Sequence, residues 1–331
     1  MRANLRPMNL GEILDRTFQI YRMRFLTILG IAVLPSLVIM AAYMVERIWV
    51  HDHFVDARIV VFYMSLGQLI TTAAMYHFTG FLYYLFWPAF IRATSGLLEG
   101  QEVTIHSCVG ILRKRARSFL ALSFAQIAIL LPLPASLFIA AAVTFNTIVN
   151  ANHMGLEVVG ILFIFIFLPI AGLLSGYFLW VGSCCALAFP ASVLEGVSWS
   201  AALRRSWKLT KGSRIRLILI LAVVLFTGWV LSMFSSRSVY VLLRIFLHGW
   251  GSRHNFILYR VLYFASNAAV LTLIGPIFPI ALTLVYYDQR IRLEGYDIER
   301  MMDDAGLNTP SIPRSGEAPS VAAAAAVEGR A

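Results

Sequence analysis

Residues Phe25–Val45 have the sequence FLTILGIAVLPSLVIMAAYMV, which contains no charged side chain. A helix needs roughly 20 apolar residues to cross the hydrocarbon core of a bilayer, and this run is long enough. Further runs without Asp, Glu, Lys or Arg follow at residues 59–91, 118–154, 158–194, 217–236 and 261–287. The pattern predicts a chain that crosses a membrane several times.

The composition supports the same class. The 331 residues are 59% hydrophobic and 13% charged, with a mean hydropathy of +0.76. Soluble globular domains have about 25% charged residues, so this chain has too few to cover a soluble surface. We expect an all-α, polytopic integral membrane helical bundle with about six transmembrane helices.

Lys and Arg are distributed unevenly between the apolar runs. They are concentrated before residue 25, between residues 92 and 117 and between residues 204 and 216, whereas residues 146–157 contain none. The positive-inside rule places such basic segments in the cytoplasm. We therefore expect a multi-pass protein with its N- and C-termini in the cytoplasm.

The basic segments also predict a partner. The net charge is +10, and cations beside a membrane attract anionic lipid headgroups by about 1 kcal/mol each. We expect lipid contacts from the cations of the three basic segments: Arg16, Arg22, Arg24, Arg113, Lys114, Arg115, Arg117, Arg204, Arg205, Lys208 and Lys211. No nucleic acid partner is expected, because the most basic segment, 198–216, lies between two membrane spans at the membrane face. The glycine-rich pattern of a nucleotide site is also absent around Lys211.

An internal repeat organises the chain. The tripeptide Leu-Glu-Gly ends at Gly100, Gly196 and Gly295, and intervals of about 100 residues indicate repeated units. Each copy follows a span with an aromatic–proline pair: Trp87-Pro88, Phe189-Pro190 and Phe278-Pro279. We predict a transmembrane domain of residues 1–304 with three parallel repeats, about 8–100, 101–196 and 197–295. The Pro-, Ser- and Ala-rich tail, 305–331, is predicted to be disordered.

Each predicted repeat opens with an amphipathic helix lying on the membrane surface. Asn9, Thr104 and Ser198 are suited to N-cap positions, and Glu12 stands at the capping-box position after Asn9. The expected apolar faces comprise Ile13, Leu14, Phe18 and Tyr21 in the first helix, and Ala202, Leu203, Trp207 and also Leu209 in the third. A further interfacial helix is predicted on the outer face within residues 237–260, where arginines alternate with aromatic and aliphatic residues.

Few ionisable residues suggest chemistry. His77 lies deep in an apolar run, which makes it an intramembrane polar candidate, although packing in the core is the favoured explanation. His51, His53 and Asp56 form a weak metal candidate that hydrated loop residues explain equally well. Acids near the C-terminus are expected to form a solvated helix with pairs such as Asp288–Arg292. We predict no metal, no cofactor and no catalytic residue.

Three motifs resemble a known family. They are MNLGEILDRTFQIYRMRF from Met8, SVLEGVSWSAALRRSWKLTKGS from Ser192 and YYDQRIRLEGYDIERM from Tyr286. In this order they resemble bacterial six-helix proteins of the glycerophosphoryl diester phosphodiesterase membrane-domain group. The resemblance implies a bacterial inner membrane location. It implies no hydrolase activity, because in that group activity belongs to a separate soluble barrel, and the barrel's metal-binding motifs are absent here.

Two functions remain open at this stage. The first is a non-enzymatic membrane scaffold or lipid-contacting regulatory module. The second is a transporter or permease-like protein for a lipid or small apolar solute, with polar span residues such as Gln126, Ser183, Asn267 and Thr272 lining a pathway. Because no carboxylate lies midway in any span, the sequence disfavours ion-coupled transport.

Overall fold

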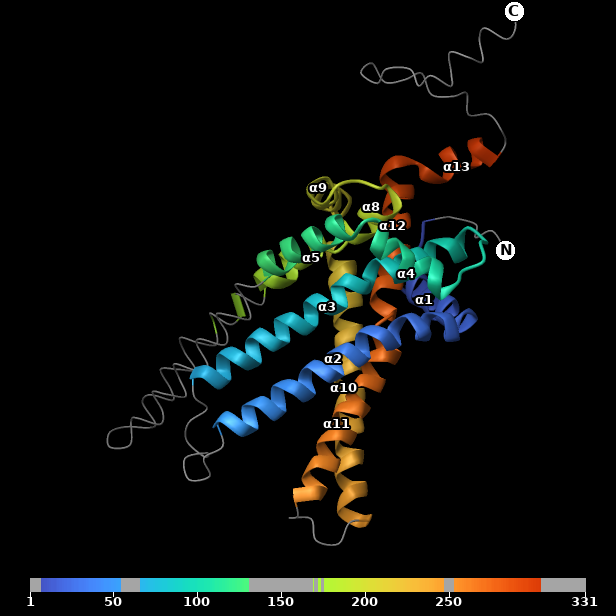
Figure 1. The fold of residues 1–331 in the computed structure, drawn as a ribbon. Coiled ribbons are helices and arrows are strands. Elements are labelled where there is room, and N and C mark those ends of the chain that lie inside the picture. The colour runs from blue at the N-terminus through green and yellow to red at the C-terminus, as the bar shows by residue number, and fades with distance from the viewer. Residues whose placement is uncertain are drawn as a thin grey trace, which may run out of the picture.

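The computed structural model describes residues 7–54, 66–130, 169, 172–173, 176–246 and 253–304. These residues form helices and turns and contain no strand (Figure 1). The first helices are α1 (Leu10–Met23), α2 (Phe25–Phe54), α3 (Leu66–Leu98), α4 (Ile105–Lys114) and α5 (Ala116–Leu130). After a helical segment over 176–185 come α8 (Ala188–Leu194), α9 (Trp199–Leu209), α10 (Arg214–Phe246), α11 (Arg253–Ile274), α12 (Ile277–Glu294) and α13 (Tyr296–Asp304).

The fold is a helical membrane bundle. In the described residues, four segments are long and apolar enough to cross a membrane: Phe25–Val45, Gly176–Leu194, Arg214–Val239 and Val261–Glu294. Residues Ala116–Ile129 form a shorter apolar helix. Helix α3 has 33 residues, enough to cross a membrane, but it contains several polar side chains, among them Gln, His, Thr and Tyr. A count of six spans stays a prediction, because most of residues 131–175 lie outside the described part.

Three units of the same design follow one another along the chain. In each, a short basic helix leads into a longer apolar one: α1 into α2 at Arg24, α4 into α5 at Arg115, and α9 into α10 through residues 210–213. The predicted capping box of Asn9 and Glu12 is present, and Thr104 forms a similar box with Ser107. Ser198 occupies the N-cap of α9 without a side-chain cap bond.

The glycines of the three Leu-Glu-Gly copies adopt the same backbone conformation. Gly100, Gly196 and Gly295 have φ angles of 75°, 70° and 66°. This left-handed region is open to glycine at little cost and disfavours residues with a Cβ. The tripeptide therefore recurs because each unit ends its second apolar helix with the same turn.

The units interlock in a ring, as the contacts between their helices show. Each short helix packs against the preceding unit: α4 on α3, α9 on α8, and α1 on α12 of the last unit. The last of these contacts joins the two ends of the described chain. Helices α3, α8 and α12 also contact one another at the centre, so their inner faces are removed from both lipid and water.

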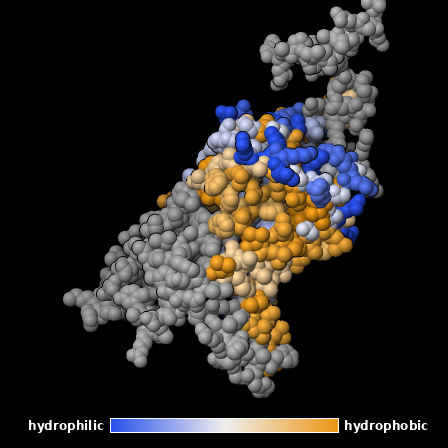
Figure 2. Space-filling model, in the orientation of Figure 1, coloured by the Kyte–Doolittle hydropathy of each residue, from blue (hydrophilic) through white to orange (hydrophobic). Residues whose placement is uncertain are grey.

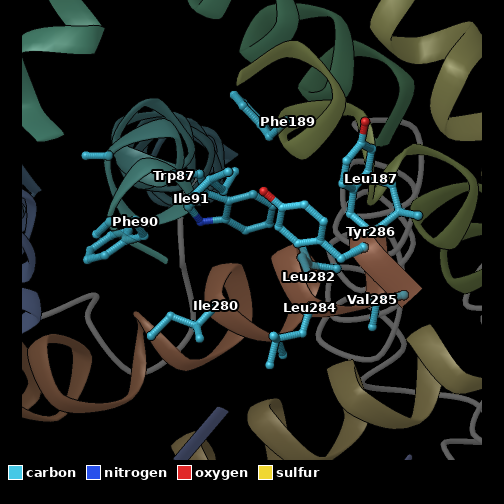
Figure 3. Close-up of a cluster of buried hydrophobic side chains, with 14 of the residues drawn as sticks. Trp87, Phe90, Ile91, Leu187, Phe189, Ile280, Leu282, Leu284, Val285 and Tyr286 are labelled. Carbon is cyan, nitrogen blue, oxygen red and sulfur yellow. The ribbon is translucent and has the colours of Figure 1, made fainter. Parts of the chain in front are cut away.

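The aromatic residues of the aromatic–proline pairs meet at this centre, where Figure 3 shows Trp87 and Phe189. The ring centroid of Trp87 lies 5.6 Å from that of Phe189 and 5.4 Å from that of Phe278, in edge-to-face geometry. Such contacts contribute about 0.5–1.5 kcal/mol each beyond the area they bury. The repeated motif thus supplies one ring from each unit to a shared core.

Two predicted apolar faces are rotated in the structure. The buried residues of α1 are Ile13, Thr17 and Ile20, while Phe18 is 53% exposed. In α9 they are Ala202, Ser206 and Leu209, while Trp207 is 41% exposed. The prediction is confirmed for Ile13, Ala202 and Leu209 and wrong for Phe18 and Trp207, because it counted only apolar residues. Thr17 and Ser206 can be buried because their hydroxyls donate to backbone carbonyls.

Two other predictions were wrong. Residues 237–246 do not form a separate interfacial helix but continue α10 to Phe246, since no Gly or Pro interrupts them. The helix with Asp288 is not solvated along most of its length: residues 279–289 of α12 are buried, Asp288 itself is 0% exposed, and only residues 292–294 are exposed. The neighbouring units cover α12, and helical periodicity alone does not reveal such contacts.

Candidate functional site

The second helix of two units is interrupted near its aromatic–proline pair. Turns at residues 186–187 and 275–276 separate α8 and α12 from the helices that precede them. Pro190 and Pro279 lie four residues after Ala186 and Gly275. Proline lacks the N–H that would bond to the carbonyl four residues earlier, and its ring clashes there. The proline of the motif thus favours an interruption in these two units, although α3 stays helical across Pro88.

Side chains from other helices complete the first interruption. The hydroxyl of Ser206 in α9 donates to the Cys184 carbonyl at 2.6 Å and accepts the Leu187 N–H at 3.1 Å. The Gln126 amide in α5 donates to the Cys185 carbonyl at 2.8 Å. These bonds satisfy backbone groups that would otherwise be buried without partners. They also fix α9 and α5 to the interrupted helix.

Two tyrosines from other helices contact the second interruption. The hydroxyl of Tyr21 in α1 donates to the Leu273 carbonyl at 2.8 Å. A Cβ built on Gly275 would collide with the Tyr83 hydroxyl, so α3 approaches the break closely. A short helix of the next unit in the ring therefore contacts the interrupted helix at both breaks.

A buried carboxylate joins the N-terminal segment to the last unit. Asp288 lies 2.6 Å from Arg216 and 3.0 Å from Arg292, and it accepts the Met8 N–H at 2.7 Å. Arg292 also donates to the Met8 carbonyl at 2.8 Å. The predicted Asp288–Arg292 pair is thus confirmed, with the two further partners that a buried charge requires.

A second charge cluster joins the second and third units. Arg205 donates to Glu195 at 2.8 Å and to Glu294 at 2.6 Å. Its pKa is raised mainly by the hydrogen bond to Glu294, against the opposing effect of burial, so it stays charged. Tyr286 donates to Glu195, and Arg290 pairs with Glu294 at 3.2 Å. Both acids belong to Leu-Glu-Gly copies.

Arg115 also makes internal contacts. Its guanidinium donates to the carbonyls of Ser192, at 2.9 Å, and Gly196. These carbonyls end α8, where a cation interacts favourably with the helix dipole. Two of the eleven cations predicted to contact lipid, Arg115 and Arg205, therefore serve to hold the short helices in place.

The other predicted cations remain available at the surface. Arg16 is half-buried, and eight exposed residues form what we call the basic rim: Arg22, Arg24, Arg113, Lys114, Arg117, Arg204, Lys208 and Lys211. Large apolar side chains lie beside them in the sequence, with Leu26 78% and Met23 67% exposed. Figure 2 shows hydrophilic residues gathered at one end of the described surface, next to a hydrophobic band. Cations next to exposed apolar surface are typical of a membrane interface.

One arginine of this region contacts tryptophans. The guanidinium carbon of Arg214 lies 5.0 Å from the ring centroid of Trp180 and 5.6 Å from that of Trp207. The two rings are 5.5 Å apart at 89°. Arg214 is the first residue of α10, at the start of a candidate span, which is the depth where tryptophan is enriched in membrane proteins.

The structure describes the backbone of the histidine candidates but not their side chains. His51 and His53 lie in the last turn of α2 and His77 lies in α3, but their side chains fall outside the described part, as does all of Asp56. The described residues contain no group of three or more His, Cys, Asp or Glu side chains that could hold a metal ion.

The polar residues considered for a transport pathway bond within the protein. Ser183 and Thr272 donate to carbonyls of their own helices, and Asn267 accepts from Ser232 at 2.5 Å. Together with the Gln126 bond described above, these contacts connect helices. They do not favour a pathway, and transport stays a prediction from the sequence.

No family model, curated protein or solved structure matches this chain. The resemblance drawn from the three motifs therefore stays a prediction. The site is described by its own chemistry: interrupted helices completed by neighbours, two charge clusters between units, and a basic rim around them.

Sequence reasoning missed Arg214 with its tryptophans, and it missed the convergence of Glu195 and Glu294 on Arg205. The sequence did contain a signal for Glu195 and Glu294, because the Leu-Glu-Gly tripeptide places a glutamate at the end of each unit. Nothing in the sequence indicated that Trp180 and Trp207, which lie in different units, flank one arginine. That contact depends on how α9 packs against the second unit.

Proposed function

We propose that this chain is a non-enzymatic membrane module that holds anionic lipids around its basic rim. The observation that carries the proposal is the recurrence of exposed cations at all three junctions between a short helix and a long one, beside exposed apolar side chains. Three such junctions on one ring present positive charge in several directions along the membrane surface. This geometry suits a scaffold that gathers lipid.

The strength of the expected attraction follows from the charges. Each cation near an anionic membrane surface contributes about 1 kcal/mol. The eight rim residues are exposed, so they keep their water until lipid approaches and pay little desolvation. Because exposed charges are screened by salt, we expect this binding to weaken as ionic strength rises.

The proposal includes an orientation and a family. We propose that the rim faces the cytoplasm of a bacterial inner membrane, because the positive-inside rule places Lys- and Arg-rich segments there. We also propose membership of the glycerophosphoryl diester phosphodiesterase membrane-domain group, without hydrolase activity. The three motifs in their order support that membership.

The test uses nanodiscs with equal amounts of phosphatidylglycerol and phosphatidylcholine. We expect native mass spectrometry at low salt to find phosphatidylglycerol enriched among the lipids retained by the full chain. Replacing Arg113, Lys114 and Arg117 by Gln lowers the expected attraction by about 3 kcal/mol, so the enrichment should fall clearly. Arg237→Gln is the control, because it removes an exposed charge far along α10. Equal retention of both lipids by the unmodified chain would contradict the proposal.

A further inference from the structure

Three half-buried arginines lie in α9 and in the first turn of α10, and one of them differs from the others. Arg205 pairs with Glu195 and Glu294, and Arg216 pairs with Asp288. Arg214 has no carboxylate partner among the described residues, and its buried Nε has no hydrogen-bond acceptor there. A partly desolvated cation without a counter-charge is costly, so this position favours an anion.

The tryptophans restrict how that anion binds. Trp180 and Trp207 both lie within cation–π distance of the guanidinium. Arginine can stack its flat face on aromatic rings while the N–H groups at its edge donate. The matching ligand is a planar or tetrahedral oxyanion that accepts two of these bonds, as phosphate does.

The surroundings place the ligand at the membrane surface. Trp180 is 45% and Trp207 41% exposed, and Ile215, next to Arg214, is 77% exposed. Lys211 is exposed one turn before, and the first turn of α10 contains no acid. A helix N-terminus without acidic residues adds a favourable potential for a negative charge. The site therefore combines an anion-binding side chain with apolar surface.

We infer that Arg214, Trp180 and Trp207 form a specific site for the phosphodiester of an anionic phospholipid. The guanidinium donates to the phosphate oxygens, the two rings contact the glycerol and upper acyl chain, and Lys211 adds charge beside the headgroup. The inference rests on the proposed function in sharing its ligand class. It differs in predicting one retained lipid, whereas the rim provides many exchangeable contacts.

Salt separates the two kinds of binding. Exposed contacts are largely screened at high ionic strength, whereas a partly buried pair is screened much less. We expect native mass spectrometry of the full chain, from nanodiscs of phosphatidylglycerol and phosphatidylcholine, to show one phosphatidylglycerol retained in concentrated ammonium acetate. Arg214→Gln should lower the affinity of that lipid by about tenfold or more, as expected for the loss of hydrogen bonds to a charged group.

Matched variants show whether the loss of lipid comes from the Arg214 site or from the loss of any positive charge. Arg204→Gln removes the same charge from an exposed position of α9, and it should leave the salt-resistant lipid in place. Arg214→Lys keeps the charge but not the planar fork, so it should also lose the lipid. If Arg214→Gln does not fold, Trp207→Leu tests the site instead. This variant keeps the arginine and should weaken retention of the salt-resistant lipid severalfold.

The results distinguish the inference from the proposed function. Enrichment at low salt without a salt-resistant lipid would overturn the inference and leave the proposed function standing. Equal retention of both lipids at low and high salt would overturn both. If inorganic phosphate raises the melting temperature of delipidated protein as much as phosphatidylglycerol does, the ligand is free phosphate and the lipid assignment is wrong. Retention that survives Arg214→Gln, Arg214→Lys and Trp207→Leu would also be evidence against the site.

Discussion

Ser206 shows how a small polar side chain can be essential inside a membrane protein. It is 0% exposed and bonds both sides of the turn at residues 186–187. A hydroxyl is the smallest side-chain group that accepts one hydrogen bond and donates another. Through it, α9 is attached to the interrupted helix of the preceding unit.

Ser206→Ala should therefore destabilise the protein by about 1–3 kcal/mol, the cost of leaving a buried polar group without a partner. Thermal unfolding in detergent measures the loss. Cys184 gives a second readout: it is 1% exposed, and it should react faster with a maleimide when the turn loosens. Ser198→Ala is the control, since Ser198 makes no cap bond. Equal melting temperatures for the two variants would show that the hydroxyl contributes nothing.

Some residue roles could be predicted and others could not. The capping box of Asn9 and Glu12 depends only on neighbours in the sequence, and it is present. The Asp288–Arg292 pair is equally local. The burial of Asp288 was missed because it depends on Met8, at the other end of the described chain. No local pattern encodes that contact.

The interrupted helices are the main feature at the scale of elements. The sequence places an aromatic–proline pair in the second span of each unit. It did not show that α3, with its own proline, stays helical throughout, whereas the second and third units break. At both breaks, side chains from other helices bond to the freed backbone groups.

Gly275 is where this packing is tightest. A Cβ there would collide with the Tyr83 hydroxyl and lie 2.6 Å from the Leu271 carbonyl oxygen. We expect Gly275→Ala to cost at least the 1–3 kcal/mol typical of overpacking, measured by thermal unfolding in detergent. Tyr83→Phe should restore only a small part of the loss, because it removes the hydroxyl but leaves the Cζ of the ring 2.5 Å from the added Cβ and the carbonyl contact unchanged.

Gly228→Ala is the matched control. Its Cβ would meet nothing closer than 3.9 Å, and alanine is favoured over glycine in a helix by about 1 kcal/mol. This variant should be as stable as the unmodified chain or slightly more so. If Gly275→Ala behaves like Gly228→Ala, the close approach of α3 to the break is not tight in solution.

At the scale of the whole molecule, the sequence established the class and the repeated design, because hydrophobicity and recurring motifs are properties of the chain itself. It did not predict that the short helices would each cross to the preceding unit. A repeated sequence is equally compatible with short helices that pack within their own units. The contact of α1 with α12 decides between the two arrangements.

Asp288 holds that closing contact, so the ring should open when its charge is removed. Asp288→Asn leaves Arg216 and Arg292 without their carboxylate. We expect a loss of roughly 3 kcal/mol, the lower end for a broken buried ion pair, because both arginines retain some access to water. The released α1 should also become a substrate for trypsin at Arg16 and Arg22.

Asp15→Asn provides the comparison, because Asp15 is an exposed acid on α1 itself. It removes the same charge without touching the contact between α1 and α12. Trypsin should cut α1 rapidly in the Asp288→Asn variant and slowly in the Asp15→Asn variant and the unmodified chain. If all three are cut at one rate and melt at one temperature, Asp288 does not close the ring, and the contact of α1 with α12 is held by apolar packing alone.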